Sequence, residues 1–405
     1  MRSTHRIKTA LVLGVLCFLC VLCGDSTVGL ASGAQEPGAP QTVSPAQLKA
    51  AIDKLGDLDY ATRTNAARTV RRTAGAQAAP ALMQAVSEHA DGYVRYRALV
   101  LLTGFNDPRA KDSIREAMSS PNDRLRAVAY GFFEHNPDSA MIPAFLDALE
   151  KEQGEFVRPA LVRALASEAV ANAPARPPLV RDVTRGQDYF RSAVIEALGD
   201  FKAQYAFDAI NGVAKLDGPL QSDAAIALGK IGDKRALETL AAIQHTAPKT
   251  AQPSIAAAIC LLGVNCDSHE NYLIETLKFT DKNAGFQELL RGAASGLAAL
   301  GVAGRADAVE ALLTVGMPSR DPTRAPVALA LATVALRNTP MILKALEAQK
   351  DRGPAIDLVA EGFDMLEEDL DKERFFTAVR RGFWQAPAGS ASRELMQTLI
   401  GKLDF

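Results

Sequence analysis

One apolar position recurs at a nearly constant interval along most of this chain. From each member to the next, the position number rises by 30 to 35. The members are Val70, Leu102, Phe133, Leu165, Leu198, Leu228, Leu262, Leu297, Leu331 and Phe363. A unit of this length is too short to enclose a hydrophobic core of its own, so neighbouring units must stack to bury their apolar faces. The repeat therefore predicts one elongated stack rather than several compact domains.

Within a unit, apolar residues follow helical spacing twice, with a short break between the two stretches. Val194, Ala197 and Leu198 share one helical face, and Gly199 begins the break. Glycine just past a helix supplies the left-handed conformation that ends it. The 405 residues are 48% hydrophobic but only 6% aromatic, and such small apolar side chains suit closely packed helices. We therefore expect an all-α fold, a right-handed α-solenoid (superhelix) of about ten helical hairpins.

An acidic residue opens the first helix of five successive units, and an arginine follows three or four residues later. The acids are Asp59, Asp91, Asp123, Glu155 and Asp188, and the arginines are Arg63, Arg95, Arg126, Arg158 and Arg191. A carboxylate at a helix start accepts hydrogen bonds from free N–H groups and opposes the helix dipole. Two interpretations remain open, an internal structural ladder or a basic stripe that binds an anionic partner. Equal numbers of acids and arginines leave no surplus charge, which favours the ladder.

Two units share a longer pattern of a hydrophobic residue and arginine, an alanine-rich stretch, Leu-Gly, and then Gly-Asp before a leucine-rich helix. Phe190-Arg191 leads to Ala197-Leu198-Gly199-Asp200, and Ala227-Leu228-Gly229 leads to Gly232-Asp233-Lys234-Arg235-Ala236-Leu237. In this pattern the chain resembles HEAT-like repeats of the phycobilisome-lyase type, over about residues 58–350. Gln221 departs from it, because an arginine is expected there. The resemblance implies an armadillo-type helical scaffold whose members include lyases and adaptors, so it implies no particular activity.

The N-terminus has the layout of a secretory signal. Three basic residues precede an apolar run over 10–23, and small residues follow at 31–34. Fourteen apolar residues are too few to span a membrane comfortably. Cys23 raises the alternative of a lipoprotein, which the bulky Leu22 before it disfavours. We expect a bacterial signal peptide over 1–33, a flexible tether over 34–44, a solenoid over 45–405 with a C-terminal cap from about 354, and a periplasmic or extracellular location.

Net charge narrows the classes of partner. Removal of the expected signal peptide takes away three of 45 basic and one of 47 acidic residues, which leaves 42 against 46 and a net charge near −4. Nucleic acids and anionic membrane surfaces both require a basic surface, so neither is an expected partner. The mature chain is expected to have no membrane span.

Cysteine and histidine offer little chemistry. Export would leave Cys260 and Cys266 on either side of one break, either as a disulfide or as a buried cysteine and a free loop thiol. The other candidate ligands have no common spacing; they are His89, His135, His245 and His269. A structural zinc site needs four ligands. No phosphate loop or nucleophile motif stands out, so we expect no catalytic residue, cofactor or metal.

The C-terminal region combines an acidic run over 364–373 with a group of aromatic residues. We expect the acidic run to be a solvated face, and the aromatic residues to cover the end of the stack. They are Phe375, Phe376, Phe383 and Trp384.

These features predict an exported, non-enzymatic scaffold that binds a protein along a concave surface lined by one helix of each hairpin. The best candidate contact patch is Tyr93, Tyr96 and Arg97, which combine aromatic and cationic groups. The same residues could instead shield the groove between units. The rival interpretation is a lyase-like or enzyme-accessory protein that acts as a chaperone and holds a substrate or cofactor. A third possibility is a purely structural spacer. Neither the partner nor the oligomeric state is indicated.

Overall fold

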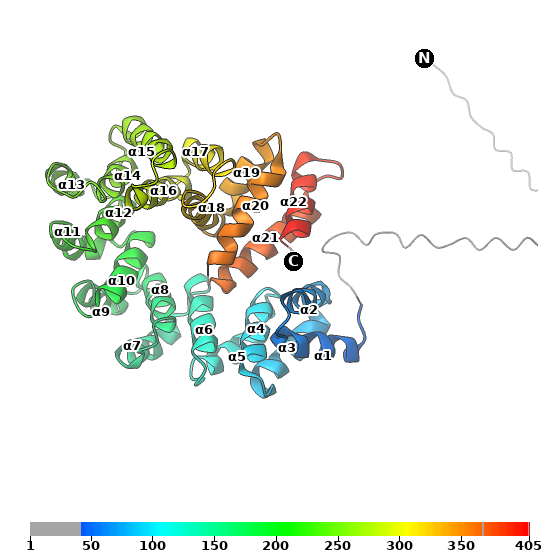
Figure 1. Cartoon of the computed structure of the whole chain (residues 1–405). Coiled ribbons are helices and arrows are strands. Elements are labelled where there is room, and N and C mark those ends of the chain that lie inside the picture. The colour runs from blue at the N-terminus through cyan, green and yellow to red at the C-terminus, as the bar shows by residue number, and fades with distance from the viewer. Residues whose placement is uncertain (1–41, 367, 404) are drawn as a thin grey trace, which may run out of the picture. The chain divides into compact units, whose positions relative to one another are not determined.

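A computed structural model describes residues 42–366, 368–403 and 405. The expected signal peptide and residues 34–41 of the expected tether lie outside this part. The described residues form 22 α-helices, four short 3₁₀-helices and no strand (Figure 1). The α-helices are α1 (Pro45–Asp53), α2 (Tyr60–Arg72), α3 (Gly75–Glu88), α4 (Gly92–Thr103), α5 (Ala110–Ala117), α6 (Asp123–His135), α7 (Ile142–Lys151), α8 (Val157–Ala169), α9 (Arg176–Asp182), α10 (Asp188–Asp200), α11 (Phe207–Ala214), α12 (Gln221–Ile231), α13 (Ala236–Gln244), α14 (Gln252–Leu261), α15 (Cys266–Asp281), α16 (Gln287–Val302), α17 (Ala306–Gly316), α18 (Arg324–Arg337), α19 (Thr339–Ala348), α20 (Arg352–Met365), α21 (Asp369–Gln385) and α22 (Ala391–Lys402). None of them is both long and apolar enough to cross a bilayer.

The even-numbered helices from α2 to α20 are the first helices of ten units, and each packs against the next (Figure 1). All ten repeat positions found in the sequence lie in these helices or, for Leu262, at the end of one. They are at most 5% exposed. The expectation of an all-α solenoid of about ten hairpins is confirmed.

Helix starts follow the capping chemistry of the sequence. Ser44 and Gln47 form the two reciprocal hydrogen bonds of a capping box at α1, with Pro45 in the first turn. Asp351 and Ser390 cap α20 and α22 by accepting hydrogen bonds from main-chain N–H groups. At these three helices, the start is therefore encoded locally, in the residue before the helix.

The Leu-Gly pairs of α10 and α12 lie where each of these helices approaches the next first helix closely. A β-carbon added at Gly199 would lie 2.8 Å from the α-carbon of Ala227, and one at Gly229 would lie 2.6 Å from the α-carbon of Ala258. A side chain of any size at these positions would push α10 from α12, or α12 from α14. The glycine of the repeat pattern is thus required by close packing between units.

The last unit departs from the regular order. Helix α22 contacts α19 and α20, and so takes the place of a second helix. Helix α21 lies instead on the inner side of the curve, where it contacts α4, α6 and α18 (Figure 1). We call α21 the closing helix, because it joins the C-terminal units to the N-terminal ones.

Two glycines leave room for side chains of the closing helix to pack against α4 and α6. A β-carbon at Gly131 would lie 3.0 Å from Leu370, and one at Gly104 would lie 2.9 Å from the carboxylate of Glu373. Leu370 belongs to the buried apolar cluster of the N-terminal units, whereas Phe375 and Phe383 belong to the C-terminal cluster. The closing helix therefore contributes to the cores of both halves.

The expectation of a solvated acidic face over 364–373 is wrong at its C-terminal end. Asp371 is 9% exposed and Glu373 is 1% exposed. Both carboxylates are buried because the closing helix turns them toward arginine and histidine side chains of other units. The aromatic residues that follow differ in burial: Phe375 and Phe383 are buried, whereas Trp384 is 43% exposed.

Candidate functional site

The arginines of the predicted ladder bind main-chain carbonyls near the end of the preceding helix. Arg95 donates to the carbonyl of Val86 (2.7 Å), and Arg191 donates to that of Val183 (3.1 Å). Arg158 donates to the carbonyls of Leu149 (3.3 Å) and Glu152 (3.0 Å). The last carbonyls of a helix lack a partner within it, and a cation there also complements the helix dipole. Arg63 and Arg126 likewise donate to loop carbonyls before their own helices.

The acids of the ladder are less uniform than the arginines. Asp59 and Asp91 cap α2 and α4, Asp123 pairs with Arg126 at 2.7 Å, and Asp188 pairs with Arg191 at 2.8 Å. Glu155 precedes α8 and is exposed. The arginines, rather than the acids, therefore make the ladder a set of joints between units.

The same joint continues where the sequence pattern breaks. Gln221 donates to the carbonyl of Ala214 (3.2 Å), and Gln252 donates to that of Gln244 (2.9 Å). Arg324 resumes the arginine form by donating to the carbonyl of Gly316 (3.3 Å). An amide replaces a guanidinium here because one N–H donor is enough to reach the carbonyl.

A row of exposed side chains follows the ladder acids along the starts of five first helices. These residues are Tyr60, Tyr93, Arg124, Phe156 and Tyr189, one in each of five consecutive units. The four aromatic side chains are 66%, 39%, 64% and 51% exposed in that order. We call this row, with the acid that precedes each member, the helix-start edge. Sequence reasoning recorded the acids but missed the row, although each member stands one or two residues after a ladder acid.

The predicted contact patch is divided by the closing helix. Tyr93 is exposed on the helix-start edge, whereas Tyr96 is 5% exposed and donates its hydroxyl to Asp369. Arg97 lies 2.8 Å from the same carboxylate. Burial raises the pKa of Asp369, but the charges of Arg97 and Lys372 and the hydrogen bond from Tyr96 outweigh it and lower the pKa to about 2. Tyr96 and Arg97 therefore bind the chain's own helix.

Two further carboxylates of the closing helix are paired with distant units: Glu373 with Arg71 of α2, and Asp371 with two other helices. Asp371 lies 2.9 Å from Nε2 of His135 and 3.0 Å from Arg337. Burial raises the pKa of Asp371, but these two partners lower it well below its usual range. The groups around Asp371 come from α6, α18 and α21, so the contact ties three units together.

The inner faces of α6, α8, α10 and α12 are also joined by charges. Arg163 lies 2.8 Å from Glu134 and 2.8 Å from Asp200, and Lys230 lies 2.6 Å from Asp200. Burial lowers the pKa of Arg163, but the two carboxylates outweigh it and raise the pKa. Each ion pair in this series links one first helix to the next, which indicates a structural role.

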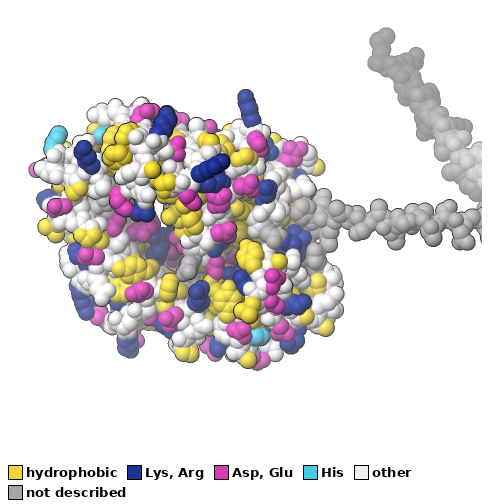
Figure 2. Space-filling model, viewed as in Figure 1, with side chains coloured by type: hydrophobic (Ala, Val, Ile, Leu, Met, Phe, Trp, Pro, Cys, Tyr) yellow, Lys and Arg dark blue, Asp and Glu magenta, His cyan; other side chains and the backbone are white. Residues whose placement is uncertain are grey.

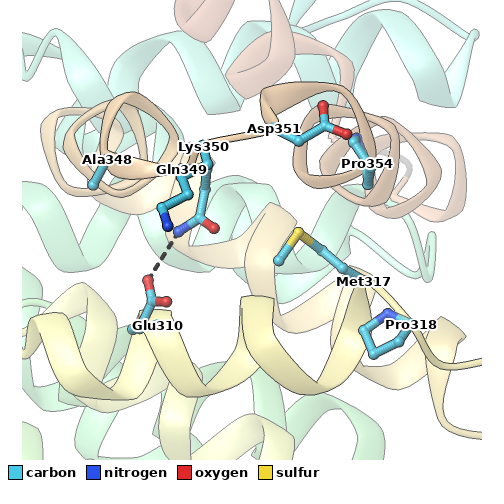
Figure 3. A pocket seen from close by; sticks show the side chains of 8 residues that line it. All are labelled: Glu310, Met317, Pro318, Ala348, Gln349, Lys350, Asp351 and Pro354. Atoms are coloured by element: carbon cyan, nitrogen blue, oxygen red, sulfur yellow. Dashed lines mark hydrogen bonds between the residues drawn. The ribbon is translucent and has the colours of Figure 1, made fainter.

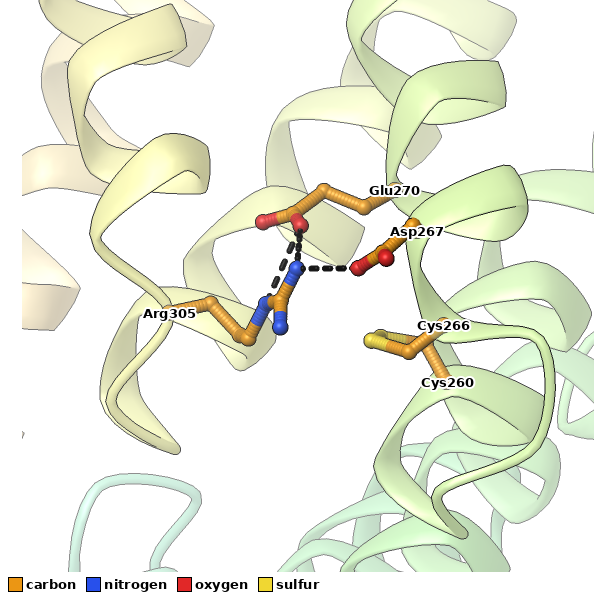
Figure 4. Close-up of a disulfide and its surroundings, with 5 residues drawn as sticks. All are labelled: Cys260, Cys266, Asp267, Glu270 and Arg305. Atoms are coloured by element: carbon orange, nitrogen blue, oxygen red, sulfur yellow. Dashed lines mark hydrogen bonds and ion pairs between the residues drawn. A yellow bond between two sulfur atoms is a disulfide. The ribbon is translucent and has the colours of Figure 1, made fainter.

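Cys260 and Cys266 are joined by a disulfide between the end of α14 and the start of α15 (Figure 4). Of the two alternatives left open by the sequence, the structure has the bonded one. Arg305 reaches the same region from the loop before α17 and pairs with Glu270 and with Asp267, the latter at 2.9 Å.

A recess of about 700 Å³ lies where α17 meets the C-terminal end of α19 and the N-terminal end of α20 (Figure 3). Gln349 donates to Glu310 at 2.9 Å across it. Met317, Pro318 and Pro354 complete an apolar wall, and none of its eight lining residues is a histidine, cysteine or serine. The recess offers no pairing of a nucleophile with a base.

Charges of both signs are interspersed on the visible face, without a field of one sign (Figure 2). Within residues 42–366, 368–403 and 405, no group of three or more histidine, cysteine, aspartate or glutamate side chains is arranged to hold a metal ion. Among the features described above, the helix-start edge is the one that is both exposed and repeated from unit to unit.

Two family models match parts of the chain. A model of HEAT repeats matches residues 79–166, and a model of the PBS lyase HEAT-like repeat matches residues 220–245. The resemblance read from the sequence is confirmed by these matches. No curated protein matches the sequence.

Several solved structures are similar to this chain at low identity. The Escherichia coli protein YibA is 18% identical, with a TM-score of 0.40 over 54% of this chain and 82% of its own. The complex of CpcE and CpcF of phycocyanin lyase from a Nostoc species is 18% identical, with a TM-score of 0.34 over 54% of this chain and 88% of that one. An importin β structure is 12% identical, with a TM-score of 0.36 over 89% of this chain and 58% of that one.

Proposed function

We propose that this chain is an exported, non-enzymatic scaffold that binds an extended, basic segment of a partner protein along the helix-start edge. The observation that carries the proposal is the row of exposed side chains at one register of five consecutive units. Tyrosine and arginine are enriched among the residues that dominate protein interfaces. A solenoid holds such residues at regular intervals on rigid elements.

The chemistry of the edge favours a cationic partner. An exposed acid precedes each exposed member of the row, as Asp59 precedes Tyr60, Glu155 precedes Phe156 and Asp188 precedes Tyr189. Lysine and arginine side chains bind aromatic faces within about 6 Å and pair with carboxylates. The four units with an aromatic member thus present both groups that a basic side chain prefers, whereas the unit of Arg124 presents an acid and an arginine.

The spacing of the edge favours an extended segment. Packed helices lie roughly 8–10 Å apart. A segment in the extended polyproline II conformation advances about 3.1 Å per residue with three residues per turn, so about three residues of a partner would span one unit. Five units would accommodate about 15 residues, with every third side chain directed at the edge.

The exported location rests on the N-terminal sequence and is supported by the disulfide between Cys260 and Cys266. Disulfides persist in oxidising compartments such as the periplasm and the cell exterior.

The alternative to a scaffold is a lyase-like or enzyme-accessory role, and the match of residues 220–245 to the PBS lyase HEAT-like repeat favours it.

The test is binding of a fluorescently labelled peptide that spans five units, with arginine at every third position and alanine and serine between, followed by anisotropy. The double variant F156A/Y189A should bind it at least about tenfold more weakly, because it loses two of the four aromatic faces. The matched control Y272A/F279A removes exposed aromatic side chains from α15, away from the edge, and should bind like the unmodified protein. Equal affinity of the two double variants, or equal binding of a peptide with glutamate in place of arginine, would contradict the proposal.

A further inference from the structure

A second recess, of about 540 Å³, opens at the seam between the closing helix and the N-terminal units. Its walls come from α2 and α3, from the end of α4, and from the C-terminal half of α21. Its lining residues are Arg71, Gly75, Gly104, Phe105, Thr377, Arg380, Arg381 and Trp384. The recess exists only because α21 folds back onto the N-terminal units.

Positive charge predominates in this recess. Arg71, Arg380 and Arg381 line it, and the adjacent carboxylate is Glu373. Arg71 lies 2.7 Å from Glu373, whereas Arg380 lies 3.5 Å from it. Three guanidinium groups against one carboxylate leave about two positive charges facing the cavity.

The hydrogen-bonding capacity of these arginines is incompletely used. Nη1 of Arg380 is buried and has no hydrogen-bond partner among the described residues, and the same is true of Nε of the neighbouring Arg72. Burial lowers the pKa of Arg380; Glu373 opposes this change, while Arg71 and Arg72 add to it. Buried donors normally find a partner, so an anion would supply what the side chains lack.

The rest of the lining consists of two aromatic side chains, two glycines and Thr377, whose hydroxyl accepts a hydrogen bond from Arg380. Phe105 is half-buried just beyond the end of α4, and Trp384 is 43% exposed on α21. The two rings border the same recess as the arginines. Such a lining combines a site for a charged head group with a surface for a flat apolar group.

We infer that this recess binds a small phosphate monoester that carries an aromatic or similarly planar group. The phosphate would accept hydrogen bonds from Arg380 and Arg381, and the planar group would pack between Phe105 and Trp384. A phosphate monoester carries a charge of about −1.5 to −2 near neutral pH, which matches the surplus of the recess. Planar guanidinium groups also bind phosphate oxygens in pairs. Because the lining comes from α2 and α21, the bound ligand would hold the two ends of the solenoid together.

Phenyl phosphate is the probe, titrated into the full chain by calorimetry and by thermal unfolding. It should bind saturably and raise the unfolding temperature. Arg381 is exposed and has no partner among the described residues, so R381Q should fold normally while it weakens binding at least about tenfold. The control R291Q, on α16, should bind like the unmodified protein.

Two further probes test the parts of the ligand. Benzoate has the ring but a single charge, and inorganic phosphate has the charge but no ring, so each should bind more weakly than phenyl phosphate. Benzoate binding as tightly would overturn the preference for phosphate, and phosphate binding as tightly would overturn the role of the rings. Absence of saturable binding by all three probes, or an unchanged affinity in R381Q, would overturn the site itself. F156A/Y189A should bind phenyl phosphate normally, which separates this test from that of the peptide.

Discussion

Replacing Glu373 with alanine should lower the free energy of unfolding by about 3 kcal/mol, because removal of one partner from a buried ion pair leaves the other charge uncompensated. The side chain of Glu373 is 1% exposed, and those of its partners Arg71 and Arg380 are 6% and 15% exposed. The substitution would leave two buried cations facing each other at the seam. Urea unfolding of E373A and the unmodified protein measures the difference.

A matched control separates this effect from the loss of any glutamate. Glu288 pairs with Arg291 on α16, and its side chain is 68% exposed. E288A should therefore change the free energy of unfolding by less than about 1 kcal/mol. The double variant R71A/E373A should lose less stability than the two single variants together, because it removes both members of the pair. Equal stability of E373A and E288A would mean that the closing helix is not held by its buried charges.

Replacing Gly362 with alanine should destabilise the protein by about 3 kcal/mol, at the upper end of the range for overpacking. A β-carbon at this position would overlap the carbonyl oxygen of Ala328 and would lie 2.7 Å from the β-carbon of Ala332. Both contacts are with α18, and the nearer one is with its main chain, so no side-chain rotation relieves the overlap. The helices α18 and α20 would have to separate.

The control for this substitution should change stability in the opposite direction. Gly212 lies within α11, and an added β-carbon there would contact nothing within 4 Å. Alanine is favoured over glycine inside a helix by about 0.5–1 kcal/mol, so G212A should be more stable than the unmodified protein. Thermal unfolding of both variants decides the point. A loss of stability in G212A as large as that in G362A would show that close helix packing is not the cause.

The repeat could be predicted from the sequence because its signals are local. Apolar residues one turn apart, such as Ala197 and Leu198 with Val194, mark a buried helical face. The expectation that Gly199 begins the break is wrong, because Gly199 lies inside α10, where it permits the close approach of α12. Each unit contacts mainly its neighbours, so a pattern that recurs once in every unit carries most of the information about the stack.

The closing helix could not be predicted from the same signals. Arg71 and Glu373 are 302 residues apart, and nothing in the sequence around either one indicates the other. An acidic run near the end of a chain is typical of a solvated surface, so burial of Asp371 and Glu373 contradicts the ordinary interpretation. The role of Gln221 was also hidden from the sequence pattern, which expects an arginine at this position. Its side-chain amide donates to a main-chain carbonyl of the preceding helix, as the ladder arginines do.

The predicted contact patch failed in part for the same reason. Tyr93, Tyr96 and Arg97 stand close together in the sequence, yet α4 presents them to different surroundings. Tyr93 begins the helix at the exposed edge, whereas Tyr96 and Arg97 face the inner side of the curve and meet Asp369. Only a contact across 272 or 273 residues distinguishes them.

Hydrogen–deuterium exchange of the full chain tests most directly whether the solenoid is closed by α21. If it is, the main-chain amides of residues 373–385 should exchange as slowly as those of α18, because the helix is packed against α4, α6 and α18. Substitution E373A should speed the exchange of α21 and of the facing helix α4 together. Rapid exchange of α21 in the unmodified protein, at the rate of a frayed terminal helix, would contradict the closed arrangement.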